Sequence, residues 1–310
     1  MGNSWFSEFL EYIAPDGAVY KFDGAVDRFS TNEEGFGMPE IEYITQKGPF
    51  QHGETVIDYR LKPRIIQFTH RRKVSGRHEY WSARSNIIDM LRPNRNVGKN
   101  RAMGTLRKYL PDGTKRDLSV SILQGPIFAT RVEGAYRDHY IEEVIRFYAP
   151  SPIFRNPDQR IIYPTNTQSS GMTFPITFPV TLGISIFEAI APISYVGTWD
   201  AYPTIQLYGP MDGPHITNLS TGELIFMDYK IQSGEIMTIA LSPSRKLITN
   251  NYGQSMKGVV RGSLSSLATF HIASNPEVPS GLNNFKVTGT NYVNGVTHVV
   301  ISYFDQYIGI

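Results

Sequence analysis

The stretch Asp58-Tyr-Arg-Leu-Lys-Pro-Arg-Ile-Ile-Gln-Phe68 joins two apolar segments through an internal proline. Ile57, Tyr59 and Leu61 alternate with polar neighbours, which is the period of a half-buried β-strand. Pro63 lacks the N–H that a sheet ladder needs, so it predicts a strand edge or a break at this point. The stretch therefore indicates a sheet whose strand is interrupted before it continues toward Phe68.

The first half of the chain is predicted to be mainly sheet with one helix. Residues 81–92 form the expected helix, and Pro93 ends it at the residue before. One helical face carries Arg84, Ile87, Ile88 and Leu91. Alternating strands are expected at 118–122 and 141–147, and Pro111-Asp-Gly113 is a strong turn signal. We therefore expect an α+β unit, a sheet with one covering helix.

A domain boundary is expected at Ala149-Pro-Ser-Pro152, which divides the chain into 1–150 and 151–310. Beyond it, short alternating strands with frequent turns predict a β-sandwich. Residues 174–182, with prolines on one face, suit an edge strand or an extended arm. Further strands are expected at 225–231, 237–241 and 299–303.

The N-terminal segment is expected to form a short helix. Over residues 3–13, apolar side chains recur at helical spacing: Trp5, Phe6, Phe9, Leu10, Tyr12 and Ile13. The segment is too short to span a bilayer, and its glutamates disfavour an anionic membrane surface. We interpret it as an extension that docks on this subunit or on a neighbour.

Composition excludes several classes of protein. Hydrophobic residues make up 41% and charged residues 19%, which fits neither a disordered chain nor a membrane protein. There is no Cys, so disulfides, thiolate metal sites and Cys nucleophiles are excluded together. The formal net charge of +2 is too small to indicate nucleic-acid binding by the whole chain.

Basic residues are concentrated between Arg60 and Arg116, where 16 of the 30 Lys and Arg lie. Within this basic block, Arg71-Arg-Lys73 followed by Ser75-Gly76 predicts a hairpin tip or an exposed loop. The block could hold nucleic acid, with Tyr80 and Trp81 nearby. We favour subunit contacts, in which the arginines bind carboxylates and carbonyls of a neighbouring copy.

The sequence shows no chemical signature of an enzyme. Nucleophile-elbow, zinc-protease, P-loop, dinucleotide-binding and EF-hand motifs are missing. The seven His residues are dispersed, which predicts isolated side chains and no metal site. Glu142 and Glu143 are adjacent on a predicted strand, so they point to opposite faces and cannot act as a glycosidase pair. We therefore predict no catalytic, cofactor-binding or metal-ligating residues, and no enzyme activity.

Two short patterns in the second half could still bind or carry sugar. The aromatic residues Tyr195, Trp199, Tyr202 and Tyr208 cluster in a segment rich in Pro and Gly. Exposed aromatics on a sandwich can stack on sugar rings, whereas buried ones fill the core, and we favour the second interpretation. Asn218-Leu-Ser220 matches a glycosylation sequon, a pattern short enough to arise by chance.

The order of short segments along the chain resembles that of the distal tail proteins of siphophages, in the phage tail-component family. No single segment is a chemical signature, and the resemblance rests on their order and spacing over nearly the whole chain. The matching segments are Gly35-Phe-Gly-Met-Pro39 with Ile41, Gly53-Glu-Thr55, Tyr59–Arg64, Arg84, Leu91-Arg-Pro93, Pro111-Asp-Gly113 with Arg116, Phe147–Pro152, Tyr202-Pro203, Gly209-Pro210, Asn218 with Thr221-Gly222, and Tyr307-Ile-Gly-Ile310.

The resemblance implies a fold and a role. It implies a tail-tube-like N-terminal β domain that forms a hexameric ring around a DNA channel, followed by a galectin-like sandwich. The ring would join the tail tube protein to the tail-tip hub or baseplate and to receptor-binding proteins, at the distal end of a phage tail. DNA would pass through without sequence-specific binding, and no membrane insertion is implied. The alternative is a carbohydrate-binding β-sandwich adhesin of a tail tip or cell surface.

Overall fold

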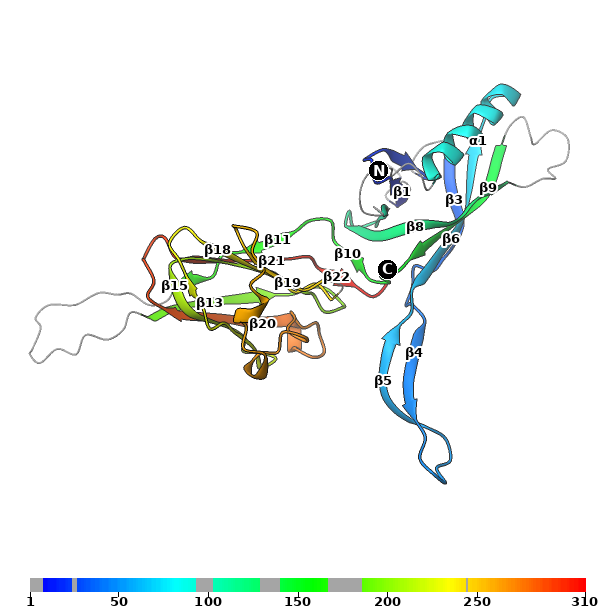
Figure 1. Ribbon diagram of the computed structural model, residues 1–310. Helices are drawn as coiled ribbons and strands as arrows, with labels where there is room; N and C mark the ends of the chain where they lie inside the picture. Colours follow the sequence, from blue (N-terminus) through cyan, green and yellow to red (C-terminus); the bar gives the residue numbers. More distant parts are fainter. Residues whose placement is uncertain (1–7, 24–26, 93–102, 129–139, 167–185, 244) are drawn as a thin grey trace, which may run out of the picture. The chain divides into compact units, whose positions relative to one another are not determined.

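The computed structural model describes residues 8–23, 27–92, 103–128, 140–166, 186–243 and 245–310, and within them the chain is mainly β (Figure 1). Two compact units divide it: Met1–Pro157 with Tyr307–Ile310, and Asp158–Gln306. The first unit thus ends a few residues after the predicted boundary at 150 and also takes the last residues of the chain. Separate folding of the two halves stays a prediction.

The first unit is built on one antiparallel sheet in the order β2-β1-β7-β8-β9-β6-β3. The short strand β10 pairs with β8 and with the C-terminal strand β22. The strands are β1 Phe9–Ile13, β2 Val19–Lys21, β3 Arg28–Glu34, β6 Arg64–Lys73, β7 Gly104–Tyr109, β8 Lys115–Phe128, β9 Tyr140–Ala149, β10 Phe154–Arg155 and β22 Gln306–Tyr307.

The helix α1, Arg77–Leu91, packs against β8 and β9 (Figure 1). Ile87 and Leu91 are buried in the core of this unit, whereas Ile88 is about half exposed. The predicted helix is confirmed, although it begins earlier than residue 81. None of the helices in the described part of the chain has the length and apolar character needed to span a bilayer.

Two expectations for the first unit are wrong. Phe9–Ile13 form strand β1, not a helix, and residues 3–7 of the predicted helix lie outside the described residues. Pairing with β2 and β7 turns Leu10 and Tyr12 into the core, so the sheet overrides the helical spacing. The predicted loop at Arg71-Arg-Lys73 is the end of β6, which pairs with β3 and β9.

The local predictions around the turns and the interrupted strand are confirmed. Strand β5, Thr55–Leu61, ends before Pro63, and β6 begins at Arg64. Gly113 has φ 81° in the turn between β7 and β8, a conformation that glycine adopts without steric cost. Strand β8 contains the expected 118–122 segment and β9 contains 141–147.

The second unit is a sandwich of two antiparallel sheets (Figure 1). One sheet has the order β11-β21-β14-β18-β19, and the other β12-β13-β20-β15-β16 with β17 beside β15. The strands are β11 Arg160–Ile162, β12 Thr165–Asn166, β13 Ile186–Ser194, β14 Thr204–Tyr208, β15 Met211–Asn218, β16 Glu223–Phe226, β17 Lys230–Ile231, β18 Ile236–Ala240, β19 Leu247–Asn250, β20 Leu282–Thr290 and β21 His298–Tyr303.

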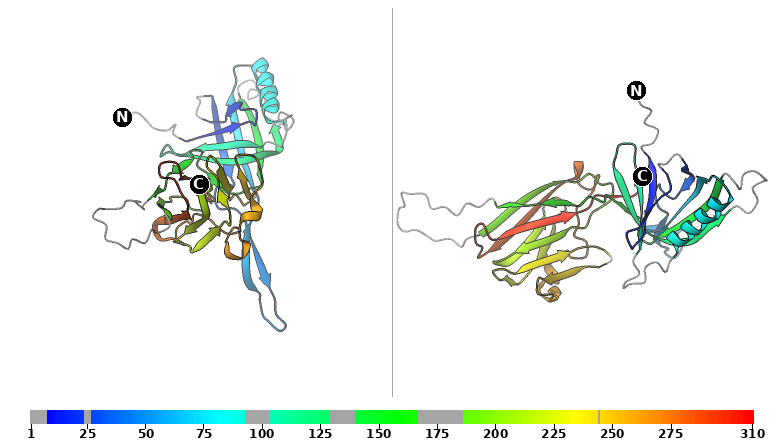
Figure 2. Two further views of the ribbon diagram at one scale, coloured as in Figure 1. Left: turned by 60° about the vertical axis from the view of Figure 1, so that its left-hand side comes forward. Right: turned by 90° about the horizontal axis from the view of Figure 1, so that it is seen from above.

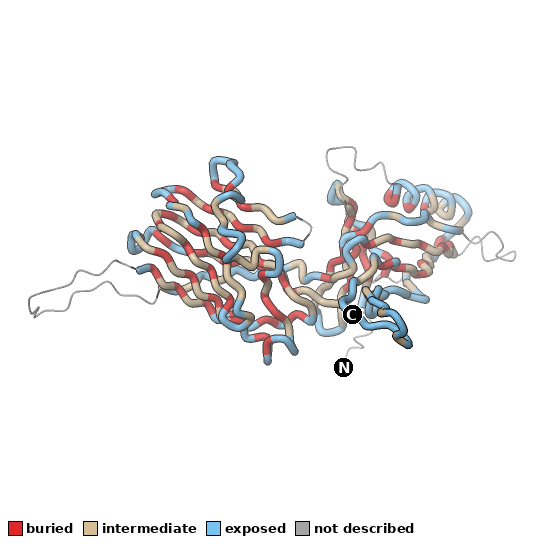
Figure 3. Tube along the Cα trace, turned by 60° about the horizontal axis from the view of Figure 1, so that its bottom comes forward, coloured by how far each residue is buried: buried red, intermediate tan, exposed pale blue. Residues whose placement is uncertain are grey.

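The sandwich core follows from period-two alternation. Buried and partly exposed residues alternate along β13, β14 and β20, and the alternation is visible along the tube in Figure 3. Side chains such as Phe285, Ile205 and Val299 fill the space between the sheets. The strand expected at 225–231 is two short strands, β16 and β17, and the segment 174–182 lies outside the described residues.

Candidate functional site: an exposed arm and its base

A two-stranded arm projects from the first unit (Figures 1 and 2). Strand β4, Ile41–Gln46, pairs with β5 and, within the described residues, with no other strand. Nearly every residue of the arm is exposed or partly exposed. A lone two-stranded hairpin is marginally stable in water, so this arm gains from a partner that covers it.

The two faces of the arm differ in chemistry. Ile41 lies opposite Leu61, and Tyr43 opposite Tyr59, so these four apolar side chains share one face. The pair between them, Glu42 and Arg60, lies on the other face. The tyrosines are exposed to 59% and 50%, and nothing described in the chain covers them. The arm is therefore amphipathic, with an uncovered apolar face.

The tip of the arm carries a fully exposed phenylalanine. Phe50 has φ 65° and an exposed fraction of 102%. The loop around it is held by Gln51, whose side-chain oxygen accepts from the Gly48 N–H at 2.9 Å. The Gln51 amide nitrogen donates to Thr55 Oγ1 at 2.8 Å. A large apolar side chain is thus presented to solvent by an ordered turn at the end of the arm.

Arg64 ties the base of the arm to the rest of the first unit. Its guanidinium donates to the carbonyls of Gly35 and Gly37 at 2.7 Å and of Ile308 at 2.6 Å. It also lies 4.6 Å from the ring centroid of Phe154. The side chain is buried, and burial lowers the pKa of Arg64 to about 10, so the group remains charged at neutral pH.

The C-terminal residues are bound at the same place. The Ile310 N–H donates to the Phe36 carbonyl at 3.0 Å. A Cβ at Gly309 would lie 2.9 Å from the Gly37 carbonyl carbon, so this approach requires a glycine. The Arg116 guanidinium covers the ring of Tyr307 at 3.6 Å. Three segments far apart in sequence therefore meet at the root of the arm.

Part of the basic block is neutralised within the described residues of the chain. Arg71 pairs with Glu142 at 2.5 Å, and Lys108 with Glu33 at 2.7 Å. Arg107 pairs with Asp117, whose carboxylate raises the pKa of the arginine. The donors of Arg64, within this block, bind carbonyls of its own chain, whereas subunit contacts by the rest of the block stay a prediction. The concentration of charge predicted an intermolecular site, but Arg71, Arg107 and Lys108 instead pair with carboxylates of their own unit.

The predicted orientation of the two adjacent glutamates is confirmed. Glu142 binds Arg71 on the partly exposed face of β9, whereas Glu143 is buried and lies 2.6 Å from His70 Nδ1. The second atoms of that pair, His70 Nε2 and Glu143 Oε2, make no hydrogen bond within the described residues. Both side chains are buried, and the His70 ring contacts the rings of Tyr20 and Phe22.

The aromatic cluster of the second unit does not form one exposed surface. Tyr195 is buried, and its hydroxyl donates to the Trp199 carbonyl at 2.5 Å. Tyr202 packs against the sandwich core, and Tyr208 stacks on His298 at 4.0 Å. The sequon residue Asn218 is fully buried, and its amide donates to the His271 carbonyl at 3.0 Å. These residues therefore serve the fold.

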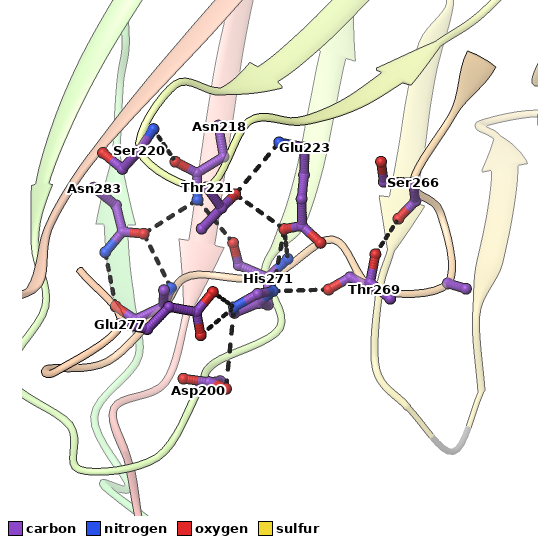
Figure 4. A network of polar contacts seen from close by, with 12 residues as sticks. Asp200, Asn218, Ser220, Thr221, Glu223, Ser266, Thr269, His271, Glu277 and Asn283 are labelled. Carbon is purple, nitrogen blue, oxygen red and sulfur yellow. Dashed lines mark hydrogen bonds and ion pairs between the residues drawn. The ribbon is translucent and has the colours of Figure 1, made fainter. Parts of the chain in front are cut away.

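Not every histidine is an isolated side chain, whereas the absence of a metal site stays a prediction. His271 is not isolated but lies among the carboxylates of Asp200, Glu223 and Glu277 (Figure 4). Sequence inspection missed this group because its members are far apart in the chain and lie in three different loops or strand ends. Asp200 and Glu223 come 71 and 48 residues before His271, and Glu277 comes six residues after it. A short run His271-Ile-Ala-Ser-Asn-Pro-Glu277 was the only local signal.

Comparison with known proteins shows the fold. No family model and no curated protein matches the sequence. The structure is similar to the Dit protein (gp 19.1) of SPP1, with a TM-score of 0.58 and 11% identity over 96% of this chain and 98% of that one. The activated phage P2 baseplate also matches, with Ca (TM-score 0.44, 10% identity) and with Sr (TM-score 0.42, 9% identity), each over 95% of this chain and 97% of the other. The expected mainly-β fold of a distal tail protein is thus confirmed.

Proposed function

We propose that the chain is a structural virion protein, the distal tail protein of a phage. Six copies form a ring that joins the tail tube to the tail-tip hub and the adhesion device, and DNA passes through its centre. The supporting observation is the likeness in fold to SPP1 Dit over the whole chain, a protein described as a paradigm of the hub adsorption apparatus in phages infecting Gram-positive hosts.

The amphipathic arm gives the proposal a physical basis. A repeated heterologous contact closes a ring when the rotation between copies fits. The apolar face with Tyr43 and Tyr59 offers such a contact, because a different surface of a neighbouring copy would cover these two side chains. Tyrosine is among the residues enriched at the centres of protein interfaces.

We assign the ring to residues 1–150 and an outward-facing sandwich to 151–310. Limited proteolysis tests this division, because exposed linkers rich in Pro and polar residues are the preferred sites of nicking. Cleavage between about residue 150 and residue 172, with two stable fragments, is expected. Cleavage at the termini alone would contradict the assignment.

Native mass spectrometry tests the ring itself. The wild-type chain should assemble as a hexamer, and Tyr43→Asp with Tyr59→Asp should shift it to smaller species, since buried interface tyrosines contribute about 2 kcal/mol each. Tyr252→Asp is the matched control, because Tyr252 lies in the sandwich and is 66% exposed. A monomeric or two-fold dimeric wild type, or equal effects of the arm and control variants, would overturn the ring.

Electron microscopy of assembled particles tests the location. The protein should form a ring at the distal end of the tail, with a central passage wide enough for duplex DNA. A position elsewhere in the particle, or a ring without a passage, would contradict the proposed role even if hexamers form in solution.

A further inference from the structure

Three carboxylate side chains of the sandwich converge on His271 (Figure 4). Asp200 lies in the segment before β14, Glu223 begins β16, and His271 and Glu277 lie in the segment before β20. Asp200, His271 and Glu277 each offer one ligand atom, and these atoms lie within 4.8 Å of one another. The imidazole is shielded, with 13% of the side chain exposed, whereas Glu277 is 52% exposed.

The Nδ1 atom of His271 has a fixed role as donor. It lies 2.8 Å from the Thr269 carbonyl, which can only accept a hydrogen bond, and 3.1 Å from Glu223 Oε2. A hydrogen on Nδ1 leaves Nε2 as the free nitrogen of the neutral imidazole. Histidines that bind metals are oriented in this way, by donating the other ring N–H to a carbonyl or carboxylate.

The Nε2 atom faces acceptors alone. It lies 3.3 Å from each carboxylate oxygen of Glu277 and 4.0 Å from Asp200 Oδ2. A lone pair directed at carboxylate oxygens is repulsive, so a positive species must lie between them. That species is either a proton on Nε2 or a metal ion.

The distance between His271 Nε2 and Glu277, and the number of carboxylates, favour a metal ion over a proton. A charge-assisted N–H···O bond is about 2.7–2.9 Å long, so 3.3 Å is loose and 4.0 Å is outside the range. Zinc binds imidazole nitrogen at about 2.0–2.1 Å and carboxylate oxygen at about 2.0–2.2 Å, so neighbouring ligands of a tetrahedral ion lie about 3.3–3.5 Å apart. The 3.3 Å between Nε2 and Glu277 matches this spacing, whereas Asp200 Oδ2, at 4.0 Å, would move closer when an ion binds. A proton would also balance only one of the three carboxylates.

The surroundings orient the carboxylate of Asp200. Its Oδ1 accepts from the Ser274 N–H at 2.9 Å and from the Ser274 hydroxyl at 2.8 Å. The other oxygen, Oδ2, is left toward His271. Support of a carboxylate by a second residue is typical of metal sites, where it fixes the direction of the ligating atom.

We propose that Asp200, His271 and Glu277 bind a zinc-class divalent cation, with Glu223 as the positioning residue behind His271. The three ligands leave a fourth tetrahedral position for water. An imidazole ligand favours Zn²⁺ over Mg²⁺ and Ca²⁺, which prefer oxygen ligands alone. The exposed Glu277 lies on the solvent side, where an ion would enter. The ion would link the segment before β14 to the segment before β20.

Zinc titration of the purified chain, followed by calorimetry and by competition with a chromophoric chelator, tests the site. One Zn²⁺ per chain is expected, with binding at least 10-fold weaker in His271→Gln and in Asp200→Asn. His298→Gln is the matched control, because His298 is exposed and its Nδ1 contacts the Val296 carbonyl. Co²⁺ should give the visible absorption of a tetrahedral complex in the wild type and in the control.

Two outcomes would overturn the site: no saturable Zn²⁺ binding by the wild type, or equal binding by His271→Gln and the wild type. If the buried positions do not tolerate change, Glu277→Gln decides, because this exposed side chain can be altered without disturbing the core. In that variant, weaker zinc binding supports the site and unchanged binding refutes it. The titration uses the sandwich of the intact chain and is independent of ring formation.

Discussion

Replacing Arg64 by methionine should loosen the root of the arm and the C-terminus together. The substitution keeps much of the unbranched stem but removes the guanidinium that donates to three backbone carbonyls at 2.6–2.7 Å. It also removes the contact with the Phe154 ring. No carboxylate is orphaned, because the partners of Arg64 are carbonyls.

The size of the effect follows from those contacts. Hydrogen bonds to a charged group contribute about 1.5–3 kcal/mol each, and the cost of burying the guanidinium offsets part of their sum. Burial lowers the pKa of Arg64 to about 10, which reflects that cost. We therefore expect the free energy of unfolding of the first unit to fall by about 3–5 kcal/mol. For a unit of this size the melting temperature should fall by roughly 10 °C.

Circular dichroism measures the melting, and hydrogen exchange with mass spectrometry locates it. The Ile310 amide, which donates to the Phe36 carbonyl, should exchange faster in the variant. Arg92→Met is the matched control, because Arg92 is 54% exposed and its ion pair with Asp89 is on the surface. A melting temperature and C-terminal exchange equal to those of the control would refute the role of Arg64.

Three further predictions concern the first unit. In a double-mutant cycle followed by urea unfolding, His70→Leu or Glu143→Leu alone should lower the free energy of unfolding by about 3 kcal/mol, because each leaves a buried polar partner without its hydrogen bond. The double variant should lose less than the sum of the two single losses, and additive losses would contradict this. Gly309→Ala should raise C-terminal hydrogen exchange, whereas Gly37→Ala, where a Cβ meets nothing within 4 Å, should not. Burial raises the pKa of Asp23 above 3.8, so the stability that its protonated form contributes should be lost as pH rises through the folded-state pKa. Asp23→Asn should lack that loss, and parallel profiles of unfolding free energy against pH for the wild type and the variant would refute it.

The sequence predicted those elements whose signals are local. Alternation gave β8 and β9, the Pro-Asp-Gly turn gave the link between β7 and β8, and Pro63 gave the break between β5 and β6. In each case the residues that carry the signal also form the structure. The predicted helix at 81–92 belongs to the same class, since α1 ends at Leu91, two residues before Pro93.

Elements that depend on distant partners were not predictable. Phe9–Ile13 has helical spacing, yet β7, about a hundred residues further on, pairs with it and makes it a strand. The cluster around His271 depends on Asp200, which is brought close only when the sandwich forms. Neither the period nor the composition of a short window contains that information.

The contacts at the root of the arm join a few residues that are far apart in the sequence. Gly35 has φ 87°, and a Cβ there would overlap the Ile65 carbonyl, so the loop before the arm needs a glycine. Arg64 then reaches carbonyls 27 and 29 residues before it and one that lies 244 residues after it. Each contact is made to backbone, so the neighbouring side chains are free to differ. In this chain the contacts depend on a glycine at position 35, an arginine at 64 and a glycine at 309, in that order.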